Sequence, residues 1–445
     1  MAIKVLNRLE RSDELLDPIM EEVLAGAPFA DSRDRTFFHT LVYGTLRWRG
    51  RLDWSIGHFS KTPLERIEPT VMNILRMGLF QVIFLDRIPV SAAVNTSVQL
   101  AKASAPSWVA GFVNAVLRNS AKNWKQVPLP DPERSPDRYL AVYGSFPAWM
   151  VRRWISRFGF EDAKSLCSAI NQIPPITIRT NSLRTTRPQL FSALRGFVED
   201  LRKTPHSSDG LCFSSPSMPI SELPLFQEGG FQVQDEAAQL VSQLLEAKPG
   251  QQVLDACAGL GVKTGHIAQL MENRGRLFAL DKNAGKTARL EKEMQRLGVT
   301  VVQPMVQDLL APLPGHEKRF DRVLLDAPCS GLGVLRRNPD AKWRTRIEKI
   351  ARFGKQQVAL LNRAADLVNP RGILVYSVCS MEPEENEAVI DVFLKDHPKF
   401  VVHKRSEDFN HLPNDFFDDQ GFFRSYPHRH GTDGFFAAAL RRDQS

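Results

Sequence analysis

The chain has 445 residues, enough for two or three domains that each bury a core of their own. Hydrophobic residues make up 43% of it and charged residues 24%, which is ordinary for a globular protein. Lys and Arg number 58 against 50 Asp and Glu, and this net charge of +8 allows a polyanionic partner without requiring one.

Simple patterns exclude three classes of protein. The N-terminus, MAIKVLNRLERSDELLD, is charged throughout and lacks the apolar core of a secretory signal. No window approaches about 18 uninterrupted apolar residues, so we expect no membrane span. The five cysteines, at positions 167, 212, 257, 329 and 379, form no CxxC pair that would hold zinc or a disulfide framework. We therefore expect a reduced, cytoplasmic protein without a metal site, and we infer no obligatory protein partner.

Residues 1–127 are predicted to form an all-helical domain. Apolar residues recur at helical spacing in the stretches 15–23, 37–42, 71–83 and 109–117. Between residues 32 and 125 there are 13 Lys and Arg against 5 Asp and Glu, most densely at Arg47, Trp48, Arg49 and Arg51. Such a cluster is either a solvated helix end or a site for phosphates and unstacked bases of RNA.

A proline-rich connector, NWKQVPLPDPERSPD, spans Asn123–Asp137 and marks the first domain boundary. Residues 138–232 are predicted to form a small α/β connecting domain. Helical spacing runs over Trp149–Ile170, a strand is expected at Ile176–Arg179 and a helix at Gln189–Leu194.

Residues 233–445 alternate strands and helices at the spacing of βαβ units, which predicts a Rossmann-like, doubly wound and mostly parallel sheet. Helices are expected at Ala284–Leu297 and Ile347–Val368. The expected strands are Gln252–Asp255, Arg276–Asp281, Val299–Gln303, Arg322–Asp326, Ile373–Val378 and Phe435–Leu440.

The stretch Gln252–Met271, QVLDACAGLGVKTGHIAQLM, has the order of a buried strand, a turn with Gly259 and Gly261, and a helix. In open α/β sheets the carboxyl end of such a strand meets an anionic or adenosine-bearing ligand. The alternative is an ordinary βα turn without a ligand.

Three acidic residues follow successive strands of the same sheet. Asp281 lies roughly 20 residues beyond the glycine turn, where a carboxylate accepts hydrogen bonds from ribose hydroxyls. Asp308 follows the third strand and Asp326 ends the fourth. Each one alone is typical of a helix N-cap, but three in register after a glycine turn favour an adenosine-type ligand.

Cys329 and Cys379 sit at or just after consecutive strand ends of that sheet, where an accessible thiolate acts as a nucleophile. Cys167 and Cys212 have no such position and are expected to be small buried hydrophobes.

Charged residues flank both cysteines. A thiol pKa is expected to be lowered by Lys263 and by the run Arg336–Lys355, which has 8 Lys and Arg against 2 Asp and Glu. The acidic cluster Glu382–Glu387 is interpreted as capping the helix after Cys379, without a catalytic role.

Longer motifs carry a family resemblance. DAPCSGLG, continued by RRNPDAKW and followed by YSVCSMEPEENE, resembles the signature of the Sun/Fmu family of RNA cytosine-C5 methyltransferases. The segments ITIRTNSL, FQVQDEAAQLV and DGFFAAAL extend the resemblance. In the N-terminal domain, VYGTLRWRGRLDW and FVNAVLRN resemble the NusB-like domain of family members that act on bacterial small-subunit (16S) ribosomal RNA. The resemblance covers most of the chain.

The resemblance implies a role for each residue around the cysteines. Cys379 would be the nucleophile that adds to carbon 6 of a cytosine, so that carbon 5 accepts a methyl group. Cys329 resembles the second cysteine, which helps to eliminate Cys379 from the product, and Asp326 resembles the group that holds the cytosine edge near N3. DNA cytosine methyltransferases place their nucleophile in a motif like Pro328-Cys329, which would exchange the two cysteine roles, but YSVCS favours Cys379.

S-adenosyl-L-methionine is the cofactor that the resemblance implies. Its contacts would be the backbone of Cys257, Ala258, Gly259, Leu260, Gly261, Val262 and Lys263, with Asp281 on the ribose, Asp308 near the adenine and Asp326 beside the methyl donor. The family loop usually reads CAAPGGKT, whereas this chain reads CAGLGVKT, and the difference bears on loop geometry and cofactor affinity.

The sequence therefore predicts an enzyme that makes 5-methylcytosine in RNA, with ribosomal RNA as the partner and a flipped or single-stranded target base. A transfer RNA substrate is the alternative with the same chemistry. The alternative of another class is a non-catalytic RNA-binding assembly or antitermination factor, favoured only by the altered loop. A nicotinamide oxidoreductase would explain the glycine turn and Asp281, but not two cysteines beside a basic run.

Overall fold

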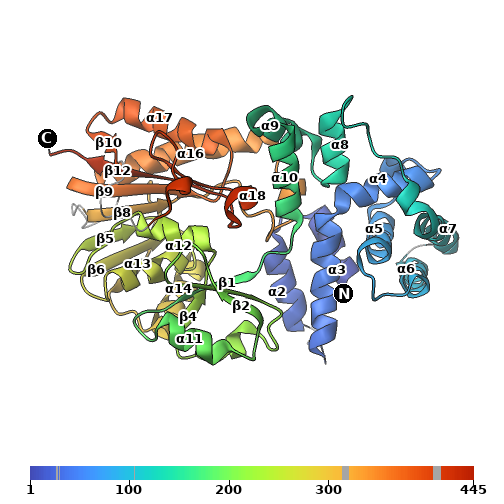
Figure 1. Cartoon of the computed structure of the whole chain (residues 1–445), viewed down its shortest axis with the longest axis horizontal. Coiled ribbons are helices and arrows are strands. Elements are labelled where there is room, and N and C mark those ends of the chain that lie inside the picture. Colours follow the sequence, from blue (N-terminus) through green and yellow to red (C-terminus); the bar gives the residue numbers. More distant parts are fainter. Residues whose placement is uncertain (27–28, 30, 105, 313–319, 404–411, 445) are drawn as a thin grey trace. The chain divides into compact units, whose positions relative to one another are not determined.

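The computed structural model describes residues 1–445 except 27–28, 30, 105, 313–319, 404–411 and 445. The chain divides into two compact units. Unit 1 comprises Met1–Gln172 and Leu335–Thr345, and unit 2 comprises Ile173–Val334 and Arg346–Ser445. Figure 1 shows helices in unit 1, and sheets covered by helices in unit 2. None of the described helices is both long enough and apolar enough to cross a membrane.

The helices of unit 1 follow the predicted apolar stripes, which confirms an all-helical N-terminal region. Helix α5 lies at the centre and packs against α1, α3, α4, α6 and α7, and its residues Ile74, Leu75 and Leu79 are fully buried. The helices are α1 Ala2–Arg11, α2 Leu16–Gly26, α3 Ser32–Arg47, α4 Arg49–Phe59, α5 Pro69–Phe84, α6 Val90–Ser104, α7 Ser107–Asn123, α8 Pro136–Tyr143, α9 Ala148–Phe158, α10 Phe160–Asn171 and α15 Ala341–Arg344.

The stretch of helical spacing over Trp149–Ile170 forms two helices, α9 and α10, because Gly159 between them has φ +80° and interrupts the α-helical backbone. Both helices belong to unit 1. The domain boundaries 1–127, 138–232 and 233–445 stay a prediction, since the two compact units are a coarser division.

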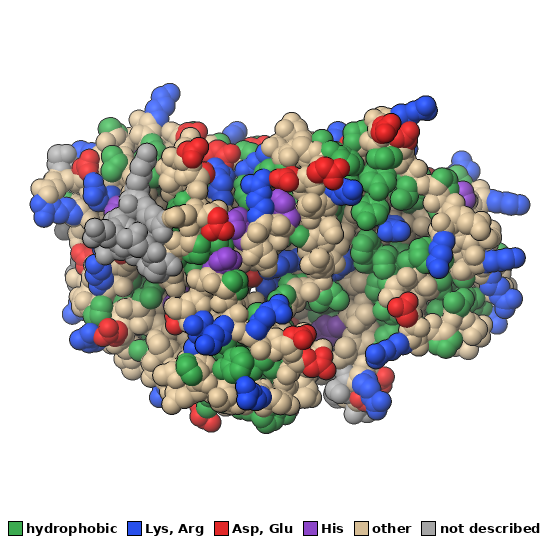
Figure 2. All heavy atoms as spheres, viewed as in Figure 1, with side chains coloured by type: hydrophobic (Ala, Val, Ile, Leu, Met, Phe, Trp, Pro, Cys, Tyr) green, Lys and Arg blue, Asp and Glu red, His purple; other side chains and the backbone are tan. Residues whose placement is uncertain are grey.

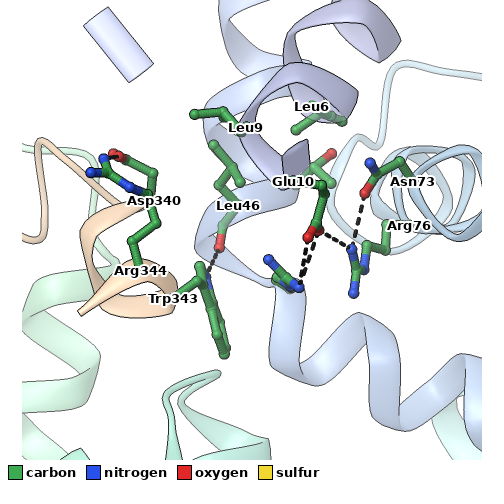
Figure 3. Close-up of a pocket in the computed structure, with 11 residues that line it drawn as sticks. Leu6, Leu9, Glu10, Leu46, Asn73, Arg76, Asp340, Trp343 and Arg344 are labelled. Carbon is green, nitrogen blue, oxygen red and sulfur yellow. Dashed lines mark hydrogen bonds and ion pairs between the residues drawn. The ribbon is translucent and has the colours of Figure 1, made fainter. Parts of the chain in front are cut away.

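A segment from far along the chain completes unit 1. Within Leu335–Thr345, Trp343 Nε1 donates to the carbonyl oxygen of Leu46 at 2.6 Å, and Lys342 Nζ donates to that of Arg47 at 2.7 Å. Figure 3 shows Trp343 with Leu6 and Leu9 of α1 around a cavity of about 20 Å³, the size of one water molecule.

Arg47 and Arg49 of the basic cluster near residue 50 do not form an open basic surface. Arg47 is buried, and its guanidinium donates to the carbonyl oxygens of Asn171, Gln172 and Arg336. Arg49 pairs with Glu10 at 3.1 Å, because backbone and carboxylate acceptors of the same unit surround these side chains. Elsewhere on unit 1, Figure 2 shows Lys and Arg side chains interspersed with exposed apolar ones.

Unit 2 contains a small antiparallel sheet with the strand order β2-β3-β1-β4. Its elements are β1 Ile176–Thr180, α11 Arg187–Leu194, β2 Glu199–Lys203, β3 Gly210–Ser214 and β4 Phe231–Val233. Helix α11 begins with a capping box in which Thr186 and Gln189 bond to each other's backbone. A small α/β domain is therefore confirmed.

The large sheet has the order β10-β12-β9-β8-β5-β6-β7, and β11 also pairs with β12. Strands β5 to β9 are parallel and β10 to β12 antiparallel, which confirms a doubly wound, mostly parallel sheet. The elements are α12 Glu236–Gln243, β5 Gln252–Asp255, α13 Val262–Leu270, β6 Arg276–Asp281, α14 Ala284–Leu297, β7 Val302–Val306, β8 Phe320–Asp326, α16 Ile347–Asp366, β9 Val368–Val378, α17 Glu387–Asp396, β10 Phe400–Val402, β11 Phe423–Ser425, α18 Pro427–His430 and β12 Phe435–Arg442.

One predicted strand was misplaced. The sequence predicted Val299–Gln303, whereas β7 runs from Val302 to Val306 and pairs with β6 from Leu277 to Asp281. In this register β7 includes Pro304. β7 is an edge strand, and an edge strand tolerates proline because its open side makes no ladder hydrogen bonds.

Candidate active site

The chain changes direction across the sheet at β5. From β5 it proceeds to β6 and β7 on one side, and then to β8 and β9 on the other. Such a switch point is where open α/β sheets bind ligands, at the carboxyl ends of the strands. Asp255 is the last residue of β5 and lies opposite Ala279 and Leu324, so β6 and β8 extend beyond it to Asp281 and Asp326.

Backbone hydrogen bonds and a close glycine contact fix the turn after β5. Ala258 donates its amide to the carbonyl oxygen of Leu280 at 2.7 Å, and Gly261 donates to that of Ala258 at 2.9 Å. Gly261 has φ +83° and precedes α13, and a Cβ there would lie 2.7 Å from Cγ of Leu290. A side chain at this position would therefore be strained by both its backbone and its neighbour. Leu260, beside it, is exposed.

The acidic residues at the strand ends have separate partners. Asp281 accepts from the amides of Gly259 at 3.0 Å and Asn283 at 2.8 Å, and it is Asn283, not Asp281, that caps α14. Asp308 is exposed and accepts from the amide of Leu310. The N-cap alternative is therefore wrong for Asp281.

The residues around this edge fit S-adenosyl-L-methionine, which combines a cationic sulfonium with an adenine ring. Burial raises the pKa of Cys257 to about 12, and the negative charge of four nearby carboxylates acts in the same direction. The carboxylates are those of Asp255, Asp326, Asp281 and Asp308. Val306 and Leu310, on either side of Asp308 in the sequence, are exposed apolar side chains that suit an aromatic ring.

Cys329 and Cys379 come together at the ends of β8 and β9, with their Sγ atoms 3.3 Å apart. Both are partly exposed, whereas Cys167 and Cys212 are buried as predicted. Since β8 and β9 are adjacent and parallel, with Asp326 opposite Ser377, their two following loops leave the sheet at the same edge.

Asp326, the last residue of β8, bonds to one residue of α13 and one of β9. Its Oδ2 accepts from Lys263 Nζ at 2.6 Å, and its Oδ1 accepts from Ser377 Oγ at 2.7 Å. Burial by itself would lower the pKa of Lys263, but Asp326, with smaller contributions from Cys379 and Asp255, raises it. Lys263 therefore stays an ammonium, coupled electrostatically to a thiol.

The expectation that basic residues lower the thiol pKa is wrong for Cys329. The contact with Cys379 raises the pKa of Cys329 well above its ordinary value, and burial and the carboxylate of Glu385 act in the same direction. The basic run 336–355 is not a continuous surface, because Arg336 and Lys342 are buried inside unit 1.

Sequence reasoning missed Asp255 and Arg179. Burial raises the pKa of Asp255 to about 7, and Thr264 Oγ1 donates to its Oδ2 at 2.7 Å. Arg179 of β1 is buried and donates to the side-chain oxygens of Gln232, Gln234 and Gln269 and to the carbonyl oxygen of Val262, the first residue of α13. Asp255 closes an apolar run in the sequence, which was a usable signal; Arg179 gave none.

Three stretches of the chain match known protein families. Residues 242–441 match the family described as 16S rRNA methyltransferase RsmB/F. Residues 1–122 match the NusB family, and residues 146–221 match the ferredoxin-like domain of RsmF/B-like methyltransferases.

Full-length relatives are similar along the whole chain. The probable ribosomal RNA small subunit methyltransferase B of Bacillus subtilis (strain 168) is 34% identical over 99% of this chain and 98% of its own. The protein of the same name from Synechocystis sp. (strain ATCC 27184 / PCC 6803 / Kazusa) is 36% identical over the same shares. The chain belongs to the RsmB/F family of methyltransferases.

Among solved structures, that of PH0851 superimposes with a TM-score of 0.82 at 27% identity, covering 99% of this chain and 97% of that one. Membership in the RsmB/F family confirms the predicted methyltransferase fold, S-adenosyl-L-methionine as the cofactor and RNA as the partner. The chain is therefore an RNA methyltransferase.

Proposed function

We propose that the protein methylates carbon 5 of a cytosine in 16S ribosomal RNA through a covalent bond between Cys379 and the base. The observation that carries this proposal is the pair of thiols 3.3 Å apart, beside the ion pair of Lys263 and Asp326. The names of the relatives, which are ribosomal RNA small subunit methyltransferases, support the choice of RNA. Such a substrate would put the protein in the cytoplasm.

Carbon 5 of cytosine is a poor nucleophile, and a covalent step changes that. The Cys379 thiolate adds to carbon 6 and turns carbon 5 into an enamine-like centre. Asp326 holds the N3 edge of the base, and Lys263 Nζ donates to its Oδ2 at 2.6 Å. S-adenosyl-L-methionine, when bound, supplies an electrophilic methyl group, and the backbone of residues 257–263, Asp281 and Asp308 would hold it.

Release of the product requires the bond between carbon 6 and sulfur to break. A water molecule takes the proton from carbon 5, the electron pair of that C–H bond re-forms the ring double bond, and the carbon–sulfur bond breaks so that Cys379 leaves as a thiolate. Cys329 assists this step, because its raised pKa keeps the thiol protonated and its S–H stabilises the departing sulfur 3.3 Å away. Since the reacting ring is stacked in a duplex, the target base must be unpaired or flipped out.

Two cysteine variants test the assignment. Cys379→Ala is expected to reduce methyl transfer to background while calorimetry shows unchanged cofactor binding. Cys329→Ala is expected to accumulate a protein–RNA adduct that survives denaturing gels. Reversed phenotypes would exchange the two roles.

Bisulfite sequencing of RNA from cells with and without the gene tests the substrate. A cytosine in 16S ribosomal RNA is expected to lose its protection in the deletion strain. Loss of protection in transfer RNA alone would contradict the choice of ribosomal RNA, and no change in either RNA would contradict cytosine methylation.

A further inference from the structure

A buried carboxylate bonds to the residue after each of the two cysteines. Glu385, in the 3₁₀ turn Pro383–Glu385, is 0% exposed. Its Oε1 accepts from the amide of Ser330 at 2.8 Å, and its Oε2 accepts from the hydroxyls of Ser330 and Ser380, both at 2.5 Å. Ser330 follows Cys329 and Ser380 follows Cys379. One side chain therefore joins the two cysteine loops.

Further bonds hold Glu385 and the Cys329 loop in place. Gln357 of α16 donates from Nε2 to Oε1 of Glu385 at 3.1 Å and to the carbonyl oxygen of Pro328 at 2.9 Å. The hydroxyl of Tyr376 in β9 donates to the carbonyl oxygen of Glu385 at 2.6 Å. Glu385 thus connects α16 and the ends of β8 and β9, and both of its carboxylate oxygens have partners.

This arrangement differs from the helix cap that the sequence suggested. Helix α17 begins at Glu387, its N-cap is Asn386, and no side-chain cap bond is made there. Glu385 instead directs its carboxylate to the two serines. A buried carboxylate is costly to desolvate, so it is retained where several donors converge on it and fix one geometry.

The charge of Glu385 also acts on the neighbouring thiol. It is one of the causes that raise the pKa of Cys329, after the contact with Cys379 and burial. A negative charge at this position penalises a second thiolate beside Cys379 and keeps the S–H on Cys329.

We propose that Glu385 is a positioning residue for methyl transfer: it holds the two cysteine loops so that their thiols meet. This inference rests on the roles proposed above for the two cysteines. It can nevertheless be tested in the free protein, because the hydrogen bonds and the charge of Glu385 are present without RNA or cofactor.

The test is the pH dependence of thiol alkylation in the full chain, without RNA or cofactor. Iodoacetamide modification of Cys329 is followed by peptide mass spectrometry between pH 7 and 11 in wild type, Glu385→Gln and Glu387→Gln. Glu387 is a matched control, since it lies two residues on and pairs with Arg424 at 3.0 Å. Glu385→Gln should move the Cys329 profile to lower pH by about one unit, roughly a tenfold faster reaction at a fixed pH.

A role confined to stability would lower the melting temperature without moving that profile relative to Glu387→Gln. An unmoved profile in folded Glu385→Gln would overturn the proposal. Because alkylation needs no methyl transfer, this result is independent of whether cytosine is the substrate.

Methyl transfer gives a second readout, and a second variant protects against misfolding of the first. Ser330→Ala with Ser380→Ala keeps the carboxylate but removes two of its donors. This double variant should lower kcat about tenfold or more, with KM for RNA within about twofold. Wild-type kcat in the double variant would overturn the positioning role, whatever the fate of Glu385→Gln.

Discussion

Lys342 in unit 1 and Lys263 in unit 2 are both largely withdrawn from water, yet their surroundings shift their pKa values in opposite directions. Lys342 donates to the carbonyl oxygen of Arg47 and lies 4.0 Å from the ring centroid of Phe146, and burial lowers its pKa well below the ordinary value. Lys263 pairs with Asp326, which outweighs burial and raises its pKa.

The charge of its partner, rather than its burial, therefore indicates the function of a buried lysine. The amine of Lys342 joins segment 335–345 to the helices of unit 1 through neutral acceptors. The ammonium of Lys263 is kept charged by a carboxylate and is coupled to Cys379. A perturbed pKa alone would have singled out both residues, but only Lys263 lies beside the thiol that we propose as the nucleophile.

The largest effect is expected when Lys263, like Lys342, is given neutral surroundings. Asp326→Asn removes the carboxylate that offsets burial, so the pKa of Lys263 should fall and methyl transfer should drop by about 10²-fold or more. Single-turnover methylation measures the rate, and acylation of Lys263 at pH 8, expected to increase, reports its protonation. Asp366→Asn, which removes the partner of Arg363 on α16, is the control. Unchanged acylation of Lys263 would contradict the electrostatic account.

Arg179 extends the comparison to a buried cation of unit 2 that has neutral acceptors. Burial lowers its pKa to about 9. Arg179→Met leaves three glutamine side chains and the carbonyl oxygen of Val262 without their donor, so the free energy of unfolding should fall by roughly 3 kcal/mol or more. Urea denaturation measures the loss, with the exposed Arg276→Met as the control. Equal stability of the two variants would remove the structural role of Arg179.

Asp255 extends the comparison to a buried acidic side chain. Its pKa of about 7 in the folded protein exceeds the value of about 3.9 in the unfolded chain, so its contribution to stability is complete below pH 4 and is lost as the pH rises to 7. Asp255→Asn has no proton to lose and should lack this decline, which is on the order of a few kcal/mol. Chemical denaturation at pH 4.5 and 7.5 compares the two proteins. Parallel pH profiles would show that Asp255 is already ionised at pH 4.5.

The smallest effect is expected for Lys342→Met, which conserves most of the side-chain volume. Because the pKa of Lys342 is lowered, the unfolded chain binds a proton that the folded protein lacks, and the stability of wild type should rise from pH 7 towards about 10.4. The variant should lose that slope, and melting temperatures at pH 7 and 9.5 measure it. Methyl transfer should stay within about twofold of wild type. A slope retained in the variant would mean that Lys342 is charged when folded.

The position of Lys342 also affects how the role of the N-terminal helices is tested. Deleting residues 1–125 would remove the partners of Lys342 and Trp343, because segment 335–345 packs within the same unit. Substitutions of exposed basic residues, followed by RNA-binding titrations over a range of salt, separate RNA affinity from this structural damage.

Local patterns predicted the ends of some elements very well. The expected spans Gln252–Asp255, Arg276–Asp281 and Ala284–Leu297 coincide with β5, β6 and α14. The apolar run of each strand ends at an aspartate, and the helical spacing of apolar residues in α14 ends before Gly298. The edge strand β7 was displaced, since its position depends on pairing with β6 rather than on its own apolar residues.

Charge patterns were less reliable than apolar ones. Arg47 and Lys342 belong to basic runs that suggested surface, yet both are buried. Glu385 belongs to an acidic run that suggested a helix cap, yet it bonds to the cysteine loops. The reason is that a charged side chain is buried wherever distant segments supply enough donors or acceptors, and those partners are far away in the sequence.

By itself, the sequence determined the helical region, the parallel sheet and the candidate residues at its edge, because short-range periodicity and strand-terminal residues specify them. Tertiary structure alone decided that two thiols 50 positions apart meet, that one lysine is charged and another is not, and that Glu385 serves both cysteine loops. Those properties depend on distances and on exclusion of water, which arise only when remote segments pack together.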